Sequence, residues 1–230
     1  MVIYSASCLP RLARSKNRLD RKAMEFLKRK GIFEISYKEY KYLRVGITAM
    51  DVSRKLSGGS PKNTDEYFCF CLKAASQDDE VEKGAEFRLP CLAKEDLDVF
   101  NANSRAELGA GSFKSYIAAR ERFGNEAGSI FGAMVGDAWH QYFWKSIACA
   151  AFMIDTAADY RKDVKSGIVA RASASDLLEL AGKIKKYCWE VIRQLGIIST
   201  FRMLFVPTIH AIMGGFEDER KKCEPQEIRL

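Results

Sequence analysis

Apolar residues recur at helical spacing through most of the second half of the chain, and this pattern limits most strongly what it can form. The clearest case is residues 176–195, where a period of 3.6 residues is kept by Leu177, Leu180, Ala181, Ile184, Cys188, Val191, Ile192 and Leu195. Ser173 or Ser175 stands at the N-cap position, and Gly196 follows as a stop. This segment therefore predicts an amphipathic helix that packs on a helical core.

Other segments after Pro90 carry similar signals. We expect a short helix at residues 94–101, a helix capped by Ser112, a further helix at 125–136 and a long apolar helix from residue 137. A last pair of apolar helices is expected around Pro207. The C-terminal part of the chain therefore predicts a helical bundle.

The segment before Pro90 shows mixed signals. A helix is predicted at residues 18–30, with Gly31 as its C-terminal stop, and a short one from Thr48 to Leu56. Residues 32–48 instead have the alternation and the composition of a strand. Two more strands, at 66–72 and 86–89, are predicted to form a hairpin around the acidic loop 77–84.

Together these segments predict a mainly α protein with a small N-terminal α/β section, a β-hairpin and a C-terminal helical bundle. The expected divisions are a basic N-terminal arm at residues 1–31, an α/β lobe at 32–93, a helical core at 94–216 and a charged tail at 217–230. Because 47% of the residues are hydrophobic and 29% are charged, the composition is that of a soluble globular protein.

Cysteine use and hydropathy indicate a reducing, cytoplasmic setting. The seven cysteines are odd in number and form no CxxC pair, so free thiols fit better than a disulfide framework or a zinc site. The best membrane candidate, residues 197–216, contains Arg202, Pro207 and His210, and we therefore expect no stable transmembrane segment. The first nineteen residues also resemble a transit peptide in composition, but we interpret them as a functional arm.

Positive charge is gathered at the N-terminus. Residues 1–55 contain fourteen Lys or Arg against five Asp or Glu, whereas residues 56–230 carry a small net negative charge, and the whole chain has a formal charge of +7. A basic segment beside a nearly neutral body attracts polyanions or an anionic surface. Contacts of this kind with nucleic acid are independent of sequence and weaken with salt, because they release condensed counterions.

The candidate nucleic-acid contacts fall into three groups. The arm supplies a dense run of cations, the next segment interleaves rings with cations as single-strand binding surfaces do, and two further arginines lie in the helical part. An ordinary strand or a solvated helix face would also explain these patterns. The candidates are Arg11, Arg14, Arg18, Arg21, Lys22, Lys28, Arg29, Lys30, Tyr37, Lys38, Tyr40, Lys41, Tyr42, Arg44, Arg120 and Arg122.

Two further patterns point to packing or to catalysis. Gly128, Gly132 and Gly136 recur every four residues, which favours a close helix crossing against residues 139–154. Three aspartates at 155, 159 and 163 share one helix face and could hold Mg²⁺, although a solvated helix end explains them as well. With two histidines and no nucleotide-binding or hydrolase motif, we expect no enzyme activity, no cofactor and no metal.

These observations favour a non-enzymatic protein that binds single-stranded RNA without sequence preference and forms homo-oligomers through its terminal arms. Nucleoproteins and coat (capsid) proteins of RNA viruses have a similar general layout, although no motif of this chain identifies such a family. A viral protein of this kind would be found in the cytoplasm and in the virion. The alternatives are a matrix-type interaction protein that docks on acidic partners or anionic membranes, and a small Mg²⁺-dependent enzyme.

Overall fold

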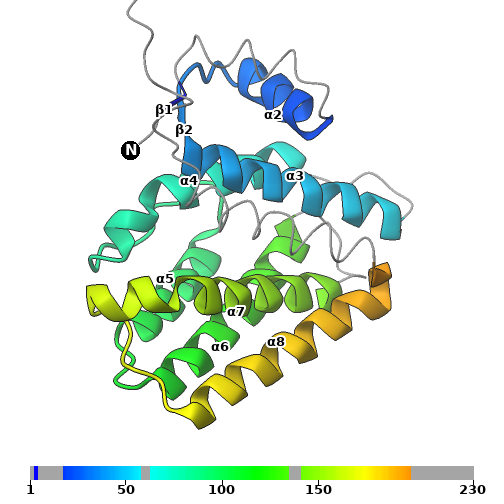
Figure 1. Cartoon of the computed structure of the whole chain (residues 1–230). Helices are drawn as coiled ribbons and strands as arrows, with labels where there is room; N and C mark the ends of the chain where they lie inside the picture. The colour runs from blue at the N-terminus through cyan, green and yellow to red at the C-terminus, as the bar shows by residue number, and fades with distance from the viewer. Residues whose placement is uncertain (1–2, 5–17, 58–62, 135–140, 198–230) are drawn as a thin grey trace, which may run out of the picture.

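The computed structural model describes residues 3–4, 18–57, 63–134 and 141–197. This part of the chain is almost entirely helical, which confirms the prediction of a mainly α protein (Figure 1). Two short strands and seven helices are described: β1 (Ile3–Tyr4), α2 (Arg18–Arg29), β2 (Ile35–Ser36), α3 (Tyr37–Ser57), α4 (Thr64–Val81), α5 (Lys94–Leu108), α6 (Phe113–Met134), α7 (Gln141–Ser166) and α8 (Ala174–Leu195).

The helices form two groups that share one core. Helix α2 lies against α3 at one end of the molecule, and α8 lies along α7 at the other (Figure 1). Aromatic side chains join the groups: the Tyr67 ring on α4 lies 5.8 Å from that of Trp144 on α7, and Phe70 lies 4.9 Å from Phe131 on α6. The buried cluster runs from α2 to α8, so the predicted lobe and the predicted core are packed together.

Helix α2 ends where the sequence predicts. The backbone N–H of Ile32 donates to the carbonyl of Leu27 at 2.9 Å, and that of Gly31 donates to Lys28 at 3.1 Å. This is a Schellman motif, which needs a left-handed residue after the helix, and Gly31 supplies it with φ of 67°. The chain then turns sharply toward β2.

The strand predicted at residues 32–48 is wrong for most of its length, because α3 begins at Tyr37. Only Ile35 and Ser36 form a strand, paired antiparallel with Tyr4 and Ile3. Ser36 and Glu39 form a capping box: the Ser36 hydroxyl accepts from the N–H of Glu39 at 3.1 Å, and the Ser36 N–H donates to Glu39 Oε2 at 2.8 Å. The buried side of α3 then repeats at helical spacing through Tyr40, Leu43, Ile47 and Met50.

The predicted hairpin is also wrong. Residues 66–72 and much of the expected acidic loop belong to α4, and residues 86–89 form no strand. Side-chain amides replace strand pairing for these residues. Asn101 on α5 bonds to both the N–H and the carbonyl of Phe87, at 2.8 and 3.1 Å, and Gln77 on α4 does the same for Arg88, at 2.6 and 2.9 Å. The backbone polar groups are therefore satisfied without a second strand.

Helices α6 and α7 cross at very short range, as the glycine spacing predicts. A Cβ added at Gly128 would lie 2.5 Å from Lys145 Cα, and one at Gly124 would lie 2.9 Å from Cys149 Cα. Gly132 faces Trp144, and Gly136 lies outside the described residues. The missing side chains let the two backbones touch, so the crossing explains glycines that otherwise weaken a helix.

The remaining helices differ from prediction mainly in length. Helix α5 runs seven residues beyond the expected end at 101, and the two helices expected between 113 and 134 are one. Ser173 caps α8 in a capping box with Asp176, and Gly196 ends it, as predicted. The expected start of α7 at residue 137 and the helices around Pro207 lie outside the described residues.

Candidate nucleic-acid interface

The first segment of the predicted arm is attached to the body at both ends. Residues 3 and 4 pair with β2, and α2 begins at Arg18 (Figure 1). Arg11 and Arg14 lie outside the described residues, in the connection between these two anchors. The prediction that they contact nucleic acid therefore stays a prediction.

Helix α2 divides its cations between two environments. Its inward side is buried through Ala23, Phe26 and Leu27. Its outward side carries Arg18, Arg21 and Lys28 together with the single acid Glu25. Arg18 is 69% exposed and 3.9 Å from Asp51, and no carboxylate of the described residues lies within ion-pair distance of Arg21 or Lys28. We call Arg18, Arg21 and Lys28 the outward row of α2.

Other cations of α2 are paired within the fold. Lys22 forms an ion pair with Asp51 on α3, while Arg29 and Lys30 both pair with Asp65 at the start of α4. Partial burial acts to raise the pKa of Asp65, but hydrogen bonds and charge from Lys30 and Arg29 dominate and lower it. These pairs hold α2 onto α3 and α4, and their local charge is largely neutralised.

A hollow of about 190 Å³ lies between α2, α3 and the start of α4, along one edge of the outward row. Its apolar lining includes the rings of Phe26 and Phe68. Three cations, Lys22, Arg29 and Arg54, and two acids, Glu25 and Asp51, also line it. The surface therefore combines cations with an apolar floor, as a site for a base and its phosphates requires.

Most of the ring-and-cation segment faces inward, because it is helical. Lys38 Nζ lies 2.7 Å from Asp78 Oδ2 on α4. The Tyr40 hydroxyl donates to Asp20 at 2.6 Å, and Arg44 Nε lies 3.4 Å from the same carboxylate. In a strand, alternate side chains of this segment would face one groove. In the helix, the same side chains point in different directions and contact different neighbours. Lys41 is half-buried, and Tyr37 lies at the first position of α3.

Tyr42 lies between the two helix groups. Desolvation of its hydroxyl raises its pKa well above the ordinary value, and the carboxylates of Asp78, Asp155 and Asp159 act in the same direction. The residue as a whole is 36% exposed although its hydroxyl is desolvated. It is the most accessible ring of the predicted stacking segment whose side chain is described.

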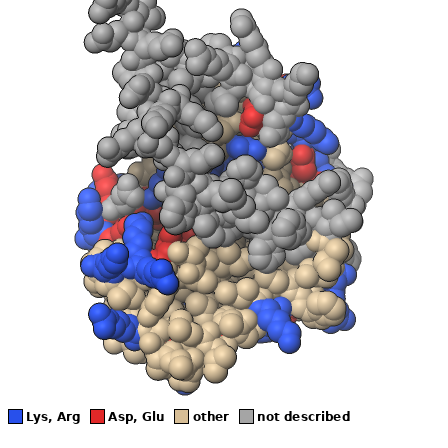
Figure 2. All heavy atoms as spheres, in the orientation of Figure 1, with Lys and Arg blue, Asp and Glu red and all other residues tan. Residues whose placement is uncertain are grey.

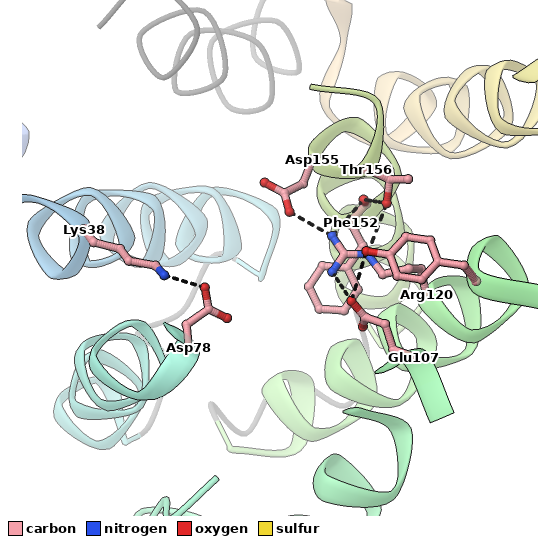
Figure 3. Close-up of polar contacts among 8 residues, drawn as sticks. Lys38, Asp78, Glu107, Arg120, Phe152, Asp155 and Thr156 are labelled. Carbon is pink, nitrogen blue, oxygen red and sulfur yellow. Dashed lines mark hydrogen bonds and ion pairs between the residues drawn. The ribbon is translucent and has the colours of Figure 1, made fainter. Parts of the chain in front are cut away.

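Arg120 is buried in the body of the molecule (Figure 3). Its guanidinium lies 2.7 Å from Glu107 on α5 and 2.8 Å from Asp155 on α7, and it donates to Thr156 at 3.1 Å. It also lies 4.9 Å from the centre of the Phe152 ring. Burial opposes its charge, but Glu107 and other neighbours raise its pKa well above the ordinary value. Arg120 therefore holds α5, α6 and α7 together.

Arg122 is exposed on a different face. It lines a hollow of about 340 Å³ between α5 and α6, together with Val99, Asn103 and Glu126. This hollow shares no lining residue with the one beside α2. The two arginines that we predicted on the helical part are therefore not brought together with the outward row.

Arg54 is a candidate that sequence reasoning missed. It is exposed on α3 and lines the hollow beside α2. Its position seven residues after Ile47 and four after Met50 places it at the edge of the buried side of α3. This spacing is present in the sequence, but it identifies Arg54 only when residues 40–54 are assigned a helical period.

The aspartate row of α7 provides no cation site. Asp155 is bonded to Arg120, and within the described ranges no three His, Cys, Asp or Glu side chains lie close enough to hold a metal ion. Burial raises the pKa of Asp163 to about 6, with a further contribution from Asp159. The five cysteines in the described ranges are free thiols.

Comparison of the chain with models of known families, with curated proteins and with solved structures finds no match. In the described part of the chain, no helix has both the length and the apolar character needed to cross a bilayer.

Proposed function

We propose that this chain is a non-enzymatic protein that binds single-stranded RNA without sequence preference and assembles with copies of itself. Binding takes place in the cytoplasm, and in the virion if the protein is viral. The outward row of α2 carries the proposal: its cations are exposed, and Arg21 and Lys28 are free of carboxylates among the described residues. Fixed, uncompensated cations attract a phosphate backbone over several ångströms.

The hollow beside the outward row supports the same function. Arg54 lies next to an apolar lining, so a phosphate can contact Arg54 while a base covers the lining. Arg11 and Arg14 precede α2 in the sequence and add two further cations to this part of the chain. Lys38, Tyr40, Arg44 and Arg120 are not part of the proposed surface, because their polar groups bond within the fold.

Fluorescence anisotropy with unrelated RNA oligomers at several salt concentrations tests this proposal. The wild type should bind all of them, and the logarithm of its affinity should fall linearly with the logarithm of the salt concentration. Arg21→Glu/Lys28→Glu should weaken binding and reduce the slope by about 1.4, given roughly 0.7 per phosphate contact on a single strand.

The matched control is Arg161→Glu/Lys162→Glu, which changes net charge equally on an exposed part of α7. It should bind more tightly than the α2 variant and keep the wild-type slope. Equal losses in both variants would mean that only net charge matters, and a wild type that binds no RNA at low salt would refute the function.

Self-assembly through the terminal segments is the second part of the proposal. Residues 217–230 supply charged groups of both signs and little to bury, so they suit contacts between copies. Sedimentation velocity of the full chain with and without RNA measures this directly. A monomer under both conditions would remove assembly from the proposal and leave RNA binding untouched.

A further inference from the structure

Helix α8 presents a row of exposed apolar and basic side chains that the proposed RNA surface does not use. Leu178 is 74% exposed and Trp189 is 58% exposed. Lys185 lies between them on the same face, since the positions are seven and four residues apart. We call this row, with the neighbouring Arg193, the α8 ridge; Lys186 is left out because it lies 4.0 Å from Glu121 on α6.

The acids of α8 are engaged away from the ridge. Asp176 bonds to Ser173 in the cap, Glu179 lies 3.7 Å from Lys183, and Glu190 accepts from Ser146 at 3.0 Å. Lys185 and Arg193 are exposed and pair with no carboxylate of the described residues. The ridge is therefore positive as well as apolar, and the half of Figure 2 over α7 and α8 shows mostly tan and blue atoms.

A second copy of the chain fits this ridge poorly. An antiparallel contact that sets Leu178 against the partner's Trp189 also sets Gly182 against the partner's Lys185. The two lysines would then lie beside the same axis, and like charges at the centre of an interface oppose association.

Single-stranded RNA also leaves much of the ridge unused. Trp189 can stack on a base, but Leu178 and the partly exposed Leu177 have no ring for stacking. A lipid surface accepts all of these groups. Leucine and tryptophan enter the boundary between headgroups and acyl chains, while lysine and arginine extend their charges to anionic headgroups.

We propose that the α8 ridge docks on an anionic lipid surface, with Leu178 and Trp189 immersed and Lys185 and Arg193 contacting the headgroups. This inference is independent of the RNA-binding proposal, because it uses a different helix at the other end of the molecule. The driving force is the apolar area immersed together with about 1 kcal/mol per basic residue near the surface.

Co-sedimentation of the full chain with vesicles tests the proposal. Binding should be weak to phosphatidylcholine alone and should rise when phosphatidylserine is added. Leu178→Ser/Trp189→Ser should lower the partition coefficient on the order of a hundredfold, since the transfer of two large side chains is lost. The matched control, Phe33→Ser/Val99→Ser, removes two exposed apolar side chains from other elements and should bind like the wild type.

The charged part has its own pair of variants. Lys185→Gln/Arg193→Gln should lower binding on the order of tenfold, given the contribution of each basic residue, whereas Arg161→Gln/Lys162→Gln should change it little. RNA affinity of Leu178→Ser/Trp189→Ser should equal that of the wild type. A loss of vesicle binding in Arg21→Glu/Lys28→Glu but not in the ridge variants would assign lipid binding to α2 and overturn the proposal.

Two further outcomes would also overturn it. If the wild type sediments as a dimer and Leu178→Ser/Trp189→Ser as a monomer, the ridge is an interface between copies. If Leu178→Ser/Trp189→Ser lowers RNA affinity and not vesicle binding, the ridge is a nucleic-acid surface. Circular dichroism of every variant should match that of the wild type, because the substituted side chains are exposed.

Discussion

The N-terminal helices α2–α4 and the C-terminal helices α6–α8 are held together in different ways. In the first group, ion pairs join neighbouring helices at the surface: the Asp65 carboxylate is one-third exposed, and its partner Arg29 is 58% exposed. In the second group, the backbones of α6 and α7 touch at glycines. Arg120 and Glu107 form the ion pair that joins this group to α5. Their side chains are only 12% and 13% exposed.

The difference shows how the same interaction changes with its surroundings. An exposed ion pair between a carboxylate and a guanidinium stabilises the fold little, because solvent and salt screen the two charges. When one partner of a buried pair is removed, the other charge stays buried and uncompensated, which is strongly destabilising. We therefore expect α2–α4 to respond to salt and α6–α8 to respond to changes in side-chain size. For the proposed RNA binding, this difference means that the paired cations of α2 can exchange a carboxylate for a phosphate at low cost.

Removing Arg120 should have the largest effect. Arg120→Met keeps much of the side-chain volume but leaves Glu107 buried without its partner, and we expect a loss of about 3–5 kcal/mol in the free energy of unfolding. Urea denaturation followed by circular dichroism measures it. The double variant Arg120→Met/Glu107→Leu should recover most of the loss. A single variant as stable as the wild type would mean that the pair is effectively solvated.

Filling the helix crossing should have the next largest effect. Gly128→Ala places a Cβ 2.5 Å from Lys145 Cα, so the two backbones must separate, at a cost of about 1–3 kcal/mol despite the better helix propensity of alanine. Thermal denaturation provides the measurement.

Gly182→Ala on α8 is the matched control for that substitution. A Cβ there meets no atom within 4 Å, and the variant should gain up to about 1 kcal/mol from helix propensity alone. If both glycine variants gain stability, the close crossing of α6 and α7 does not exist.

Neutralising Asp65 should have a smaller effect. Asp65→Asn removes the partner of both Arg29 and Lys30, and we expect a loss of about 1 kcal/mol at low salt. The loss should shrink at high salt because screening already weakens the pairs. Asp98→Asn, in an exposed position of α5, should change stability less. The same Asp65 variant should bind RNA more tightly if the freed cations contact phosphate.

The smallest effect should depend on pH. The folded-state pKa of Asp163 is about 6, above the ordinary value of 3.8, because burial and nearby Asp159 disfavour its charge. The folded protein therefore holds this proton more tightly, and the stability contribution of Asp163 falls as pH rises from about 4 to 6.

Asp163→Asn removes this dependence. The variant should be more stable than the wild type at pH 7, by less than about 1 kcal/mol since the group is partly hydrated, and equally stable at pH 4. Unfolding in urea at the two pH values measures the difference. A constant difference at both pH values would show that the amide changes packing and not ionisation.

Several features were predicted from the sequence because they depend on local signals. The end of α2 at Gly31, the cap of α8 at Ser173 and the crossing at Gly128 each follow from residue type and spacing. The helical period of α8 is visible because one of its sides is solvated. Residues 66–72 have no such contrast, because α4 is buried on more than one side and its short apolar run suits a strand as well as a helix.

The segment 37–44 illustrates the same limit for the candidate site. Its three tyrosines favour a strand, but the Ser36–Glu39 capping box and the spacing of Tyr40, Leu43 and Ile47 indicate a helix. Among the predicted nucleic-acid contacts, the burial of Arg120 was not foreseen for a different reason. A buried arginine and an exposed one look alike in sequence, and only the carboxylates of Glu107 and Asp155 distinguish them.

By itself, the sequence determined the mainly helical class, the ends of several helices and the excess of positive charge near the N-terminus. The tertiary structure decided which of those charges remain available. Charge is a property of composition and survives any folding, but its availability depends on whether a carboxylate from a distant segment, such as Asp51 or Asp65, lies within a few ångströms.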